Sequence, residues 1–267
     1  MSNILVVGKG FVGDAVGFTL SKFHIVHYHD PDKGDHYDMD HLNDLDGVVL
    51  CLPTPSHEDG ACDDSLVIDY YETIRVVRKE LPILIKSTTS IKTLNMLQCE
   101  CDQYLTFSPE FLVASRARED MVNAPFYIYS SVNPNTSQFW SDIFLNCVKN
   151  GTNTVFCNSM VEAGFVKYAI NSFLATKVTF MNELYNLFSS YTNGMGNFNE
   201  VVEMMSMDHR IGSSHMQVPG PDGKFGWGGA CFPKDTLEFV QFGQDTCEPL
   251  NVLESARTAN RSHRNNA

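Results

Sequence analysis

The sequence has little positive charge, no long apolar run and no paired cysteine motif. It contains 19 lysine and arginine residues against 32 aspartate and glutamate residues, a formal net charge of −13. A chain this acidic lacks the positive surface that binds a nucleic-acid backbone, so no nucleic-acid partner is expected. No apolar stretch approaches the roughly 20 residues of a membrane-spanning helix, so no membrane partner is expected either.

The first residues and the cysteines bear on location and metal binding. Met1-Ser2-Asn3 leads directly into the apolar residues 4–7, without the basic and long apolar segments of a secretory signal. The eight cysteines are irregularly spaced, and Cys99-x-Cys101 has no matching second pair. Neither a disulfide framework nor a zinc site is therefore predicted. We expect a cytoplasmic protein with reduced thiols and no bound metal.

Short apolar runs dominate the first part of the chain. They alternate with helix-like segments from residue 4 to 157, which is typical of βαβ units around a mostly parallel sheet. We predict strands at residues 4–7, 24–28, 47–52, 83–86, 105–107 and 126–129. The predicted fold class is α/β, with a Rossmann-type, doubly wound nucleotide-binding domain over residues 1–157.

Helical signals replace the strands after residue 157. Ser159-Met160-Val161-Glu162 is a capping box, and no Pro or Gly interrupts the chain between Phe165 and Tyr191. This long helix is apolar on more than one face, which favours burial in a homodimer interface. Shorter helices are predicted at residues 198–207 and 236–242, and the polar tail 259–267 is predicted to be frayed. Residues 158–267 should thus form an all-helical domain that dimerises.

A glycine fingerprint follows the first predicted strand. In Gly8-Lys9-Gly10-Phe11-Val12-Gly13, the glycines permit a tight turn, approach of a pyrophosphate and close helix packing. Asp30 ends the second strand where an acid accepts hydrogen bonds from ribose hydroxyls, which favours NAD over NADP. The alternative is a glycine-rich turn without a ligand. Lys33 is either near the adenosine or solvated, and Thr54 either faces the ligand or lies in a proline-bracketed turn.

Cys231 follows a run of glycines and precedes a predicted helix. Pro233 suits the first helical position, because its missing amide would be unpaired there anyway. Cys231 would then lie just before a helix N-terminus, which lowers the pKa of a thiol below the value of about 8.5 of an ordinary cysteine. The alternative is a buried structural cysteine beside a flexible loop. We predict that Cys231 is a covalent nucleophile.

Further polar residues occur where a catalytic site is expected. Lys167 and Asn171 share one face of the long helix, and a lysine on an apolar helix needs a polar partner. Glu110 and Thr88 follow predicted strands, at the carboxyl edge where α/β sheets bind ligands. Each has a structural alternative: an ion pair for Lys167, and an ordinary surface loop for Glu110 and Thr88.

These segments resemble the UDP-glucose/GDP-mannose dehydrogenase family over nearly the whole chain. They occur in the family's order: the glycine fingerprint, Leu52-Pro53-Thr54-Pro55, Lys86-Ser87-Thr88, Ser108-Pro109-Glu110-Phe111-Leu112, Lys167-x-x-x-Asn171, Leu174-Ala175-Thr176-Lys177, Asn182-Glu183 and Gly228-Gly229-Ala230-Cys231-Phe232-Pro233-Lys234-Asp235. The resemblance implies that two NAD oxidise a sugar C6 alcohol to a carboxylate. Cys231 would hold the aldehyde as a thiohemiacetal and then as a thioester.

The resemblance also implies residue roles. Lys167 and Asn171 would stabilise an oxyanion, Asp235 and Thr88 would orient water or a hydroxyl, and Glu110 would act in acid/base steps. The substrate-contacting residues would be Phe111, Leu112, Arg210 and Gly228.

The sequence also departs from the family pattern. Ala114 stands where the family has a second glutamate, and Phe126 follows Pro125 where the family has an arginine. The C-terminal UDP-binding domain of the family is expected to be lacking.

Two other functions fit parts of the pattern. The first is a non-catalytic module that binds NAD and dimerises, or that pairs with a subunit supplying a further domain. The second is a two-electron dehydrogenase related to the 6-phosphogluconate and hydroxyacid dehydrogenases. These share a Lys-x-x-x-Asn helix but have no role for a nucleophilic cysteine.

Overall fold

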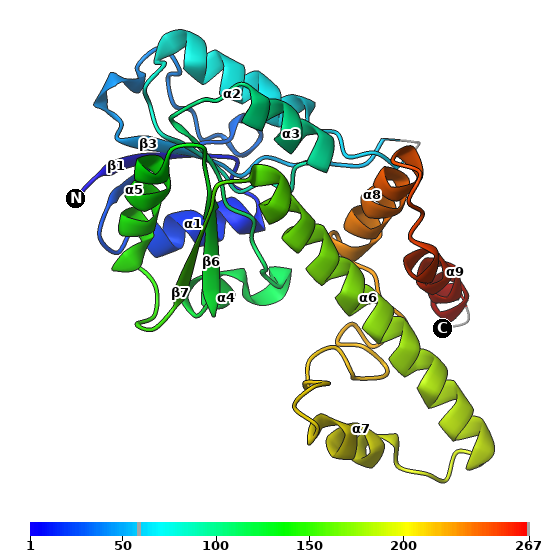
Figure 1. The fold of residues 1–267 in the computed structure, drawn as a ribbon. Helices are drawn as coiled ribbons and strands as arrows, with labels where there is room; N and C mark the ends of the chain where they lie inside the picture. The colour runs from blue at the N-terminus through cyan, green and yellow to red at the C-terminus, as the bar shows by residue number, and fades with distance from the viewer. Residues whose placement is uncertain (58–59, 266–267) are drawn as a thin grey trace. The chain divides into compact units, whose positions relative to one another are not determined.

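The computed structural model describes residues 1–57 and 60–265 and divides the chain into two compact units. The first unit contains Met1–His57 and Cys62–Lys167, and the second contains Tyr168–Ala267 and residues 58–61. Figure 1 labels many of the elements, which follow one another as β1 (Asn3–Val7), α1 (Phe11–Leu20), β2 (Ile25–His29), β3 (Gly47–Leu50), α2 (Ser65–Val77), β4 (Ile83–Ile85), α3 (Ile91–Cys99), β5 (Leu105–Phe107), α4 (Ala117–Val122), β6 (Phe126–Ser130), α5 (Pro134–Leu145), β7 (Asn153–Cys157), α6 (Met160–Tyr191), α7 (Phe198–Ser206), α8 (Phe232–Asp245) and α9 (Asn251–Asn265).

The first unit is built on one sheet in the order β2-β1-β3-β4-β5-β6-β7. All neighbouring strands are parallel except β5 and β6, which are antiparallel. The predicted α/β class and mostly parallel sheet are therefore confirmed. The sequence prediction missed β7, because this edge strand is mostly exposed and lacks the apolar run of a buried strand.

Two apolar layers cover the sheet because successive strand side chains point to opposite faces. Leu5 and Val7 pack with residues of α2 and α3, whereas Ile4 and Val6 pack with residues of α1 and α5. Figure 1 shows α2 and α3 above the strands and α1 and α4 below them. This arrangement leaves the carboxyl ends of the parallel strands, with the loops that follow them, as the place for a ligand.

The second unit is helical, and it contains the part of α6 that follows Lys167. The helix predicted from the capping box is confirmed as α6, but only half of the box forms: the amide of Glu162 donates to Ser159 Oγ at 3.2 Å. The Glu162 carboxylate instead accepts from the Cys157 thiol at 3.2 Å. The predicted helices at 198–207 and 236–242 correspond to α7 and to the longer α8.

The prediction of a frayed C-terminal tail was wrong for residues 259–265, which continue α9; residues 266–267 lie outside the described part of the chain. Leu253, Ala256 and Asn260 form a buried stripe on this otherwise polar helix. Tertiary packing of that stripe holds the helix. Among residues 1–57 and 60–265, no helix has both the length and the apolar character needed to cross a membrane.

Candidate active site

The glycine fingerprint forms the turn between β1 and the N-terminus of α1. A side chain at Gly8 would place its Cβ 2.4 Å from the Cys51 carbonyl oxygen, and one at Gly13 would meet the Gly8 carbonyl oxygen at 1.9 Å. Gly10, in contrast, has no atom within 4 Å of the position of a Cβ. The backbone is therefore tightly packed at Gly8 and Gly13 and open at Gly10, as a helix N-terminus that receives a pyrophosphate requires.

Two other predicted cofactor residues contact this turn. Asp30, directly after β2, accepts a hydrogen bond from the Lys9 amide through Oδ2 at 2.6 Å. Lys33 Nζ donates to the carbonyl oxygen of Lys9. The carboxylate expected at the ribose thus lies against the glycine turn, so these residues fit a bound dinucleotide. Phe11 and Val12, in the first turn of α1, pack against the apolar layer that contains Ile4 and Val6.

Thr54 and Thr88 lie together at the carboxyl edge of the sheet. Thr54 Oγ1 donates to the carbonyl oxygen of Thr88 at 2.7 Å. Thr54 is buried and Thr88 is half-buried. The loops after β3 and β4 are therefore joined where a ligand-facing surface was predicted.

Lys167 and Glu110 form a buried ion pair in the first unit. Lys167 Nζ donates to the Glu110 carbonyl oxygen at 2.6 Å and to its Oε1 at 2.8 Å. Both side chains are at most 5% exposed. Glu110 also accepts from the Leu112 amide at 2.7 Å, and Lys167 lies 5.5 Å from the centre of the Phe111 ring. The segment from Glu110 to Leu112 is therefore folded around the Lys167 ammonium group.

Lys86, which the sequence offered only as part of a motif, is a second buried lysine. Its Nζ donates to Ser108 Oγ at 2.9 Å and lies 5.1 Å from the centre of the Tyr127 ring. Burial lowers the pKa of Lys86 from 10.5 to about 8. The sequence signal that could have indicated this buried lysine is its position directly after an apolar strand.

In the second unit, Asn171 and Lys234 both contact the carboxylate of Asp235. Asn171 Nδ2 donates to Oδ2 at 2.5 Å, and Lys234 Nζ donates to Oδ1 at 2.7 Å. Asp235 is fully buried. Both carboxylate oxygens are thus held by donors, as burial of a charge demands.

Cys231 is the N-cap residue of α8, and its carbonyl oxygen accepts from the Asp235 amide at 2.8 Å. The predicted position just before the helix is confirmed, although Pro233 occupies the second helical position and not the first. The half-buried Cys231 follows Gly229, whose φ of +80° favours glycine. A helix N-terminus is the setting that the predicted nucleophilic role of Cys231 requires.

Arg210 lies on an exposed turn, where its guanidinium group bonds to Asp208 at 2.5 Å. Lys177 of α6 donates to the carbonyl oxygens of Ile211 and Gly212, at 3.1 and 2.9 Å, and so holds this turn.

Gly228, the remaining predicted substrate residue, lies against Arg264: a Cβ at Gly228 would lie 2.2 Å from Arg264 Nη2. The contacts of Arg264 with residues 218–229, which we call the glycine loop, were not predicted from the sequence.

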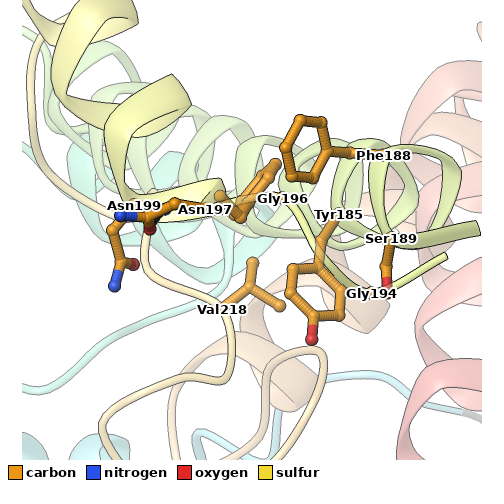
Figure 2. A pocket seen from close by; sticks show the side chains of 9 residues that line it. Tyr185, Phe188, Ser189, Gly194, Gly196, Asn197, Asn199 and Val218 are labelled. Carbon is orange, nitrogen blue, oxygen red and sulfur yellow. Dashed lines mark hydrogen bonds between the residues drawn. The ribbon is translucent and has the colours of Figure 1, made fainter. Parts of the chain in front are cut away.

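A cavity of about 260 Å³ lies elsewhere in the second unit, between the end of α6 and α7. Figure 2 shows that Tyr185, Phe188, Asn197 and Val218 are among its lining residues. None of the residues predicted from the sequence as catalytic or ligand-binding lines it. The cavity therefore does not contribute to the candidate site.

Two family models match the chain. The NAD-binding-domain model of the UDP-glucose/GDP-mannose dehydrogenase family matches residues 35–148, and the central-domain model of the same family matches residues 161–262. The cofactor predicted from the fingerprint and Asp30, NAD, is thereby confirmed.

Individual proteins agree with the family models. A UDP-glucose 6-dehydrogenase from Rickettsia bellii is 29% identical over 82% of this chain and 50% of its own length. A UDP-glucose 6-dehydrogenase from Rhizobium meliloti is 30% identical over 80% of this chain and 50% of its own. The chain therefore spans about half the length of these relatives. A solved UDP-glucose dehydrogenase from Pyrobaculum islandicum has the same fold, with a TM-score of 0.80 and 23% identity over 98% of this chain and 68% of its own.

Proposed function

Because the chain belongs to the UDP-glucose/GDP-mannose dehydrogenase family, we propose that it oxidises the C6 alcohol of a nucleotide sugar to a carboxylate. UDP-glucose is the proposed substrate and UDP-glucuronate the product. The position of Cys231 at the N-terminus of α8, directly after the glycine loop, carries the proposal. A thiolate at this position suits a reaction that passes through a bound aldehyde.

NAD, when bound, would accept one hydride in each of two oxidation steps. The residues that would hold it are Gly8, Gly10, Gly13 and Asp30, with Lys33 and Thr54 near its ends. In the first oxidation the C6 alcohol would lose a hydride and a proton to give an aldehyde. The Cys231 sulfur would add to that aldehyde to form a thiohemiacetal. The second oxidation would give a thioester, which water would hydrolyse to the carboxylate and the thiol.

Residues of the first unit would manage protons and charge. Lys167 is a buried cation, which suits stabilisation of the oxyanion formed when sulfur or water adds to the carbonyl carbon. Glu110 is held by two donors and would exchange protons with the reacting oxygen. Thr88 would orient water or the hydroxyl, and Phe111 and Leu112 would contact the sugar.

In the second unit, the donors that hold Asp235 fix its carboxylate in one orientation. Asp235 would therefore orient the attacking water, and Asn171 would assist in binding the oxyanion. Gly228 and Arg210 would contact the nucleotide sugar. The exposed guanidinium group of Arg210 would exchange its pairing with Asp208 for a phosphate oxygen.

The proposal is tested by counting NADH formed per sugar consumed with UDP-glucose and a panel of UDP- and GDP-sugars. We expect two NADH per sugar for the native chain and no carboxylate product for Cys231→Ala. Cys247→Ala, which changes an exposed cysteine, is the control and should retain full activity.

Other results would favour the other functions. One NADH per sugar, unchanged by Cys231→Ala, would indicate a two-electron dehydrogenase. NAD binding without turnover of any sugar would indicate a binding module or a subunit that needs a partner.

The same proposal includes a homodimer formed through α6. Four apolar side chains on this helix, spaced seven residues apart, are exposed: Val166 by 38%, Phe173 by 69%, Phe180 by 56% and Leu187 by 67%. A heptad stripe is the pattern that packs against another helix, and a second copy would present the same stripe. The cytoplasmic location stays a prediction from the sequence.

A further inference from the structure

Gly226 and Trp227, shortly before Cys231, are held by polar side chains from two helices, α6 and α9. The side-chain amide of Asn260, on α9, accepts from the Trp227 amide at 2.7 Å and donates to the Trp227 carbonyl oxygen at 2.9 Å. The indole nitrogen donates to Thr179 Oγ1 of α6 at 2.9 Å. Asn182, also on α6, accepts from the Gly226 amide at 2.9 Å. The Asn260 side chain thus satisfies both backbone polar groups of Trp227.

Asn260 is an unusual residue for its position. It continues the buried stripe of Leu253 and Ala256, where an apolar side chain would ordinarily lie, and it is only 6% exposed. A buried amide is costly unless its hydrogen bonds are formed, and both are formed here with the loop backbone. The packing of α9 alone does not call for an asparagine at this position.

The glycine loop comes close enough to α9 for these bonds because Gly226 and Gly228 have no side chains. A Cβ at Gly226 would lie 2.4 Å from Asn260 Oδ1, and the φ of this residue is +69°. Arg264, one turn further along α9, donates through Nε to the Trp227 carbonyl oxygen at 3.0 Å and pairs with Asp222 at 2.8 Å. The loop is therefore tied to α9 at Asp222 and at Trp227.

The same helix also holds the segment after Cys231. Arg257 Nη1 donates to the Pro233 carbonyl oxygen at 3.2 Å and to Thr236 Oγ1 at 2.8 Å. Arg257 and Asn260 are three residues apart, and so project from one side of α9. Cys231 is bracketed by two attachments to one helix, at Trp227 before it and at Pro233 after it.

We propose that Asn260 and Arg257 are positioning residues for Cys231. They fix the peptide on each side of the cysteine, so that its sulfur stays at the N-terminus of α8. The inference rests on the proposed function for its purpose, since a nucleophile must be held in place to act. Its test does not depend on turnover.

The test measures alkylation of Cys231 by iodoacetamide in the full chain between pH 5 and 10, followed by peptide mass spectrometry so that each cysteine is read separately. Asn260→Ala and Arg257→Met are compared with the native chain. Arg261→Met is the matched control, because Arg261 is exposed on α9 and bonds to Thr258. Lys234 and Asp235, the ionisable residues of the first turn of α8, are unchanged in all variants.

We expect the pH midpoint of Cys231 alkylation to move up toward about 8.5 in Asn260→Ala and Arg257→Met, and to stay at the native value in Arg261→Met. A purely structural role would lower the melting temperature of both variants without moving the midpoint, and that result would overturn the inference. NADH formation by the native chain is scored separately. A moved midpoint without native turnover refutes the proposed reaction alone, whereas native turnover with an unmoved midpoint refutes the positioning role alone.

Discussion

Lys167 Nζ binds Glu110 twice, at the main-chain oxygen and at the carboxylate, at 2.6 and 2.8 Å. The first bond fixes the backbone of the loop after β5, and the second compensates a charge that burial would otherwise penalise. One lysine therefore shapes the loop and neutralises its acid.

Removing the lysine should expose this double role. Lys167→Met leaves the Glu110 carboxylate buried without its cation, so we expect a loss of about 3–5 kcal/mol in the free energy of unfolding. Urea unfolding measures it, with Lys149→Met at an exposed position as control. Adding Glu110→Gln to Lys167→Met should recover most of the loss. Equal stability of the single variant and the native chain would contradict the buried charge pair.

Because of Lys86, the free energy of unfolding should depend on pH in the alkaline range. The pKa of this lysine is about 8 in the fold against 10.5 ordinarily, so the unfolded chain binds the proton more strongly between these values. The penalty for burying the charge is complete below pH 8 and is relieved as the pH rises to 10.5.

The comparison of Lys86→Met with the native chain isolates this effect. The stability of the variant relative to the native chain should fall by on the order of 3 kcal/mol between pH 7 and pH 10.5, as measured by urea unfolding. The exposed Lys79→Met should show no such change. A Lys86→Met difference that is the same at both pH values would refute the low pKa.

Two glycines of the fingerprint should separate folding from cofactor binding. Gly13→Ala forces a Cβ against the Gly8 carbonyl oxygen, and we expect it to lower stability by about 1–3 kcal/mol. Gly10→Ala enters open space and should leave the melting temperature unchanged while weakening NAD binding, because the methyl group takes the place of the pyrophosphate. Calorimetric titration with NAD and a thermal melt decide both points, and undiminished NAD affinity in Gly10→Ala would contradict the assigned site.

Asp30 should set the preference between NAD and NADP. Asp30→Asn removes the charge that accepts from the ribose hydroxyls and repels a 2′-phosphate. We expect NAD to bind about tenfold more weakly, a cost typical of a hydrogen bond to a charged group, and the preference over NADP to shrink. Asp32→Asn, on the exposed turn after Asp30, is the control. Unaltered binding of both cofactors would remove Asp30 from the site.

The heptad stripe on α6 should determine the oligomeric state. Phe173→Glu with Phe180→Glu places two charges in the proposed interface, so we expect the mass in solution to fall from that of a dimer to that of a monomer. Light scattering after size-exclusion chromatography measures it. Val76→Glu, at an exposed apolar position on α2, is the control. A native chain that is already monomeric would end the dimer proposal.

Local sequence patterns were enough to predict most strands, the glycine turn and the start of the long helix. The apolar runs of β1 to β6, the glycine fingerprint and the start of α6 could be read directly, because each depends on residues close together in the chain. The place of Cys231 before a helix was equally local, since Pro233 marks that start. β7 was not predicted, because an exposed edge strand lacks the apolar run from which a buried strand is recognised.

Tertiary structure decided what depends on residues far apart. The Glu162 carboxylate accepts a hydrogen bond from Cys157 and does not complete the predicted capping box. The polar end of the chain forms α9, because contacts with other segments outweigh its weak local preference for helix. Glu110 and Lys167, 57 residues apart, became a pair for the same reason. Asn260 looks like a surface residue in the sequence, and only the fold shows that it holds the Trp227 backbone. The sequence by itself determined the position of Cys231 before a helix and the glycine turn after β1, whereas long-range hydrogen bonds decided what holds these segments in place.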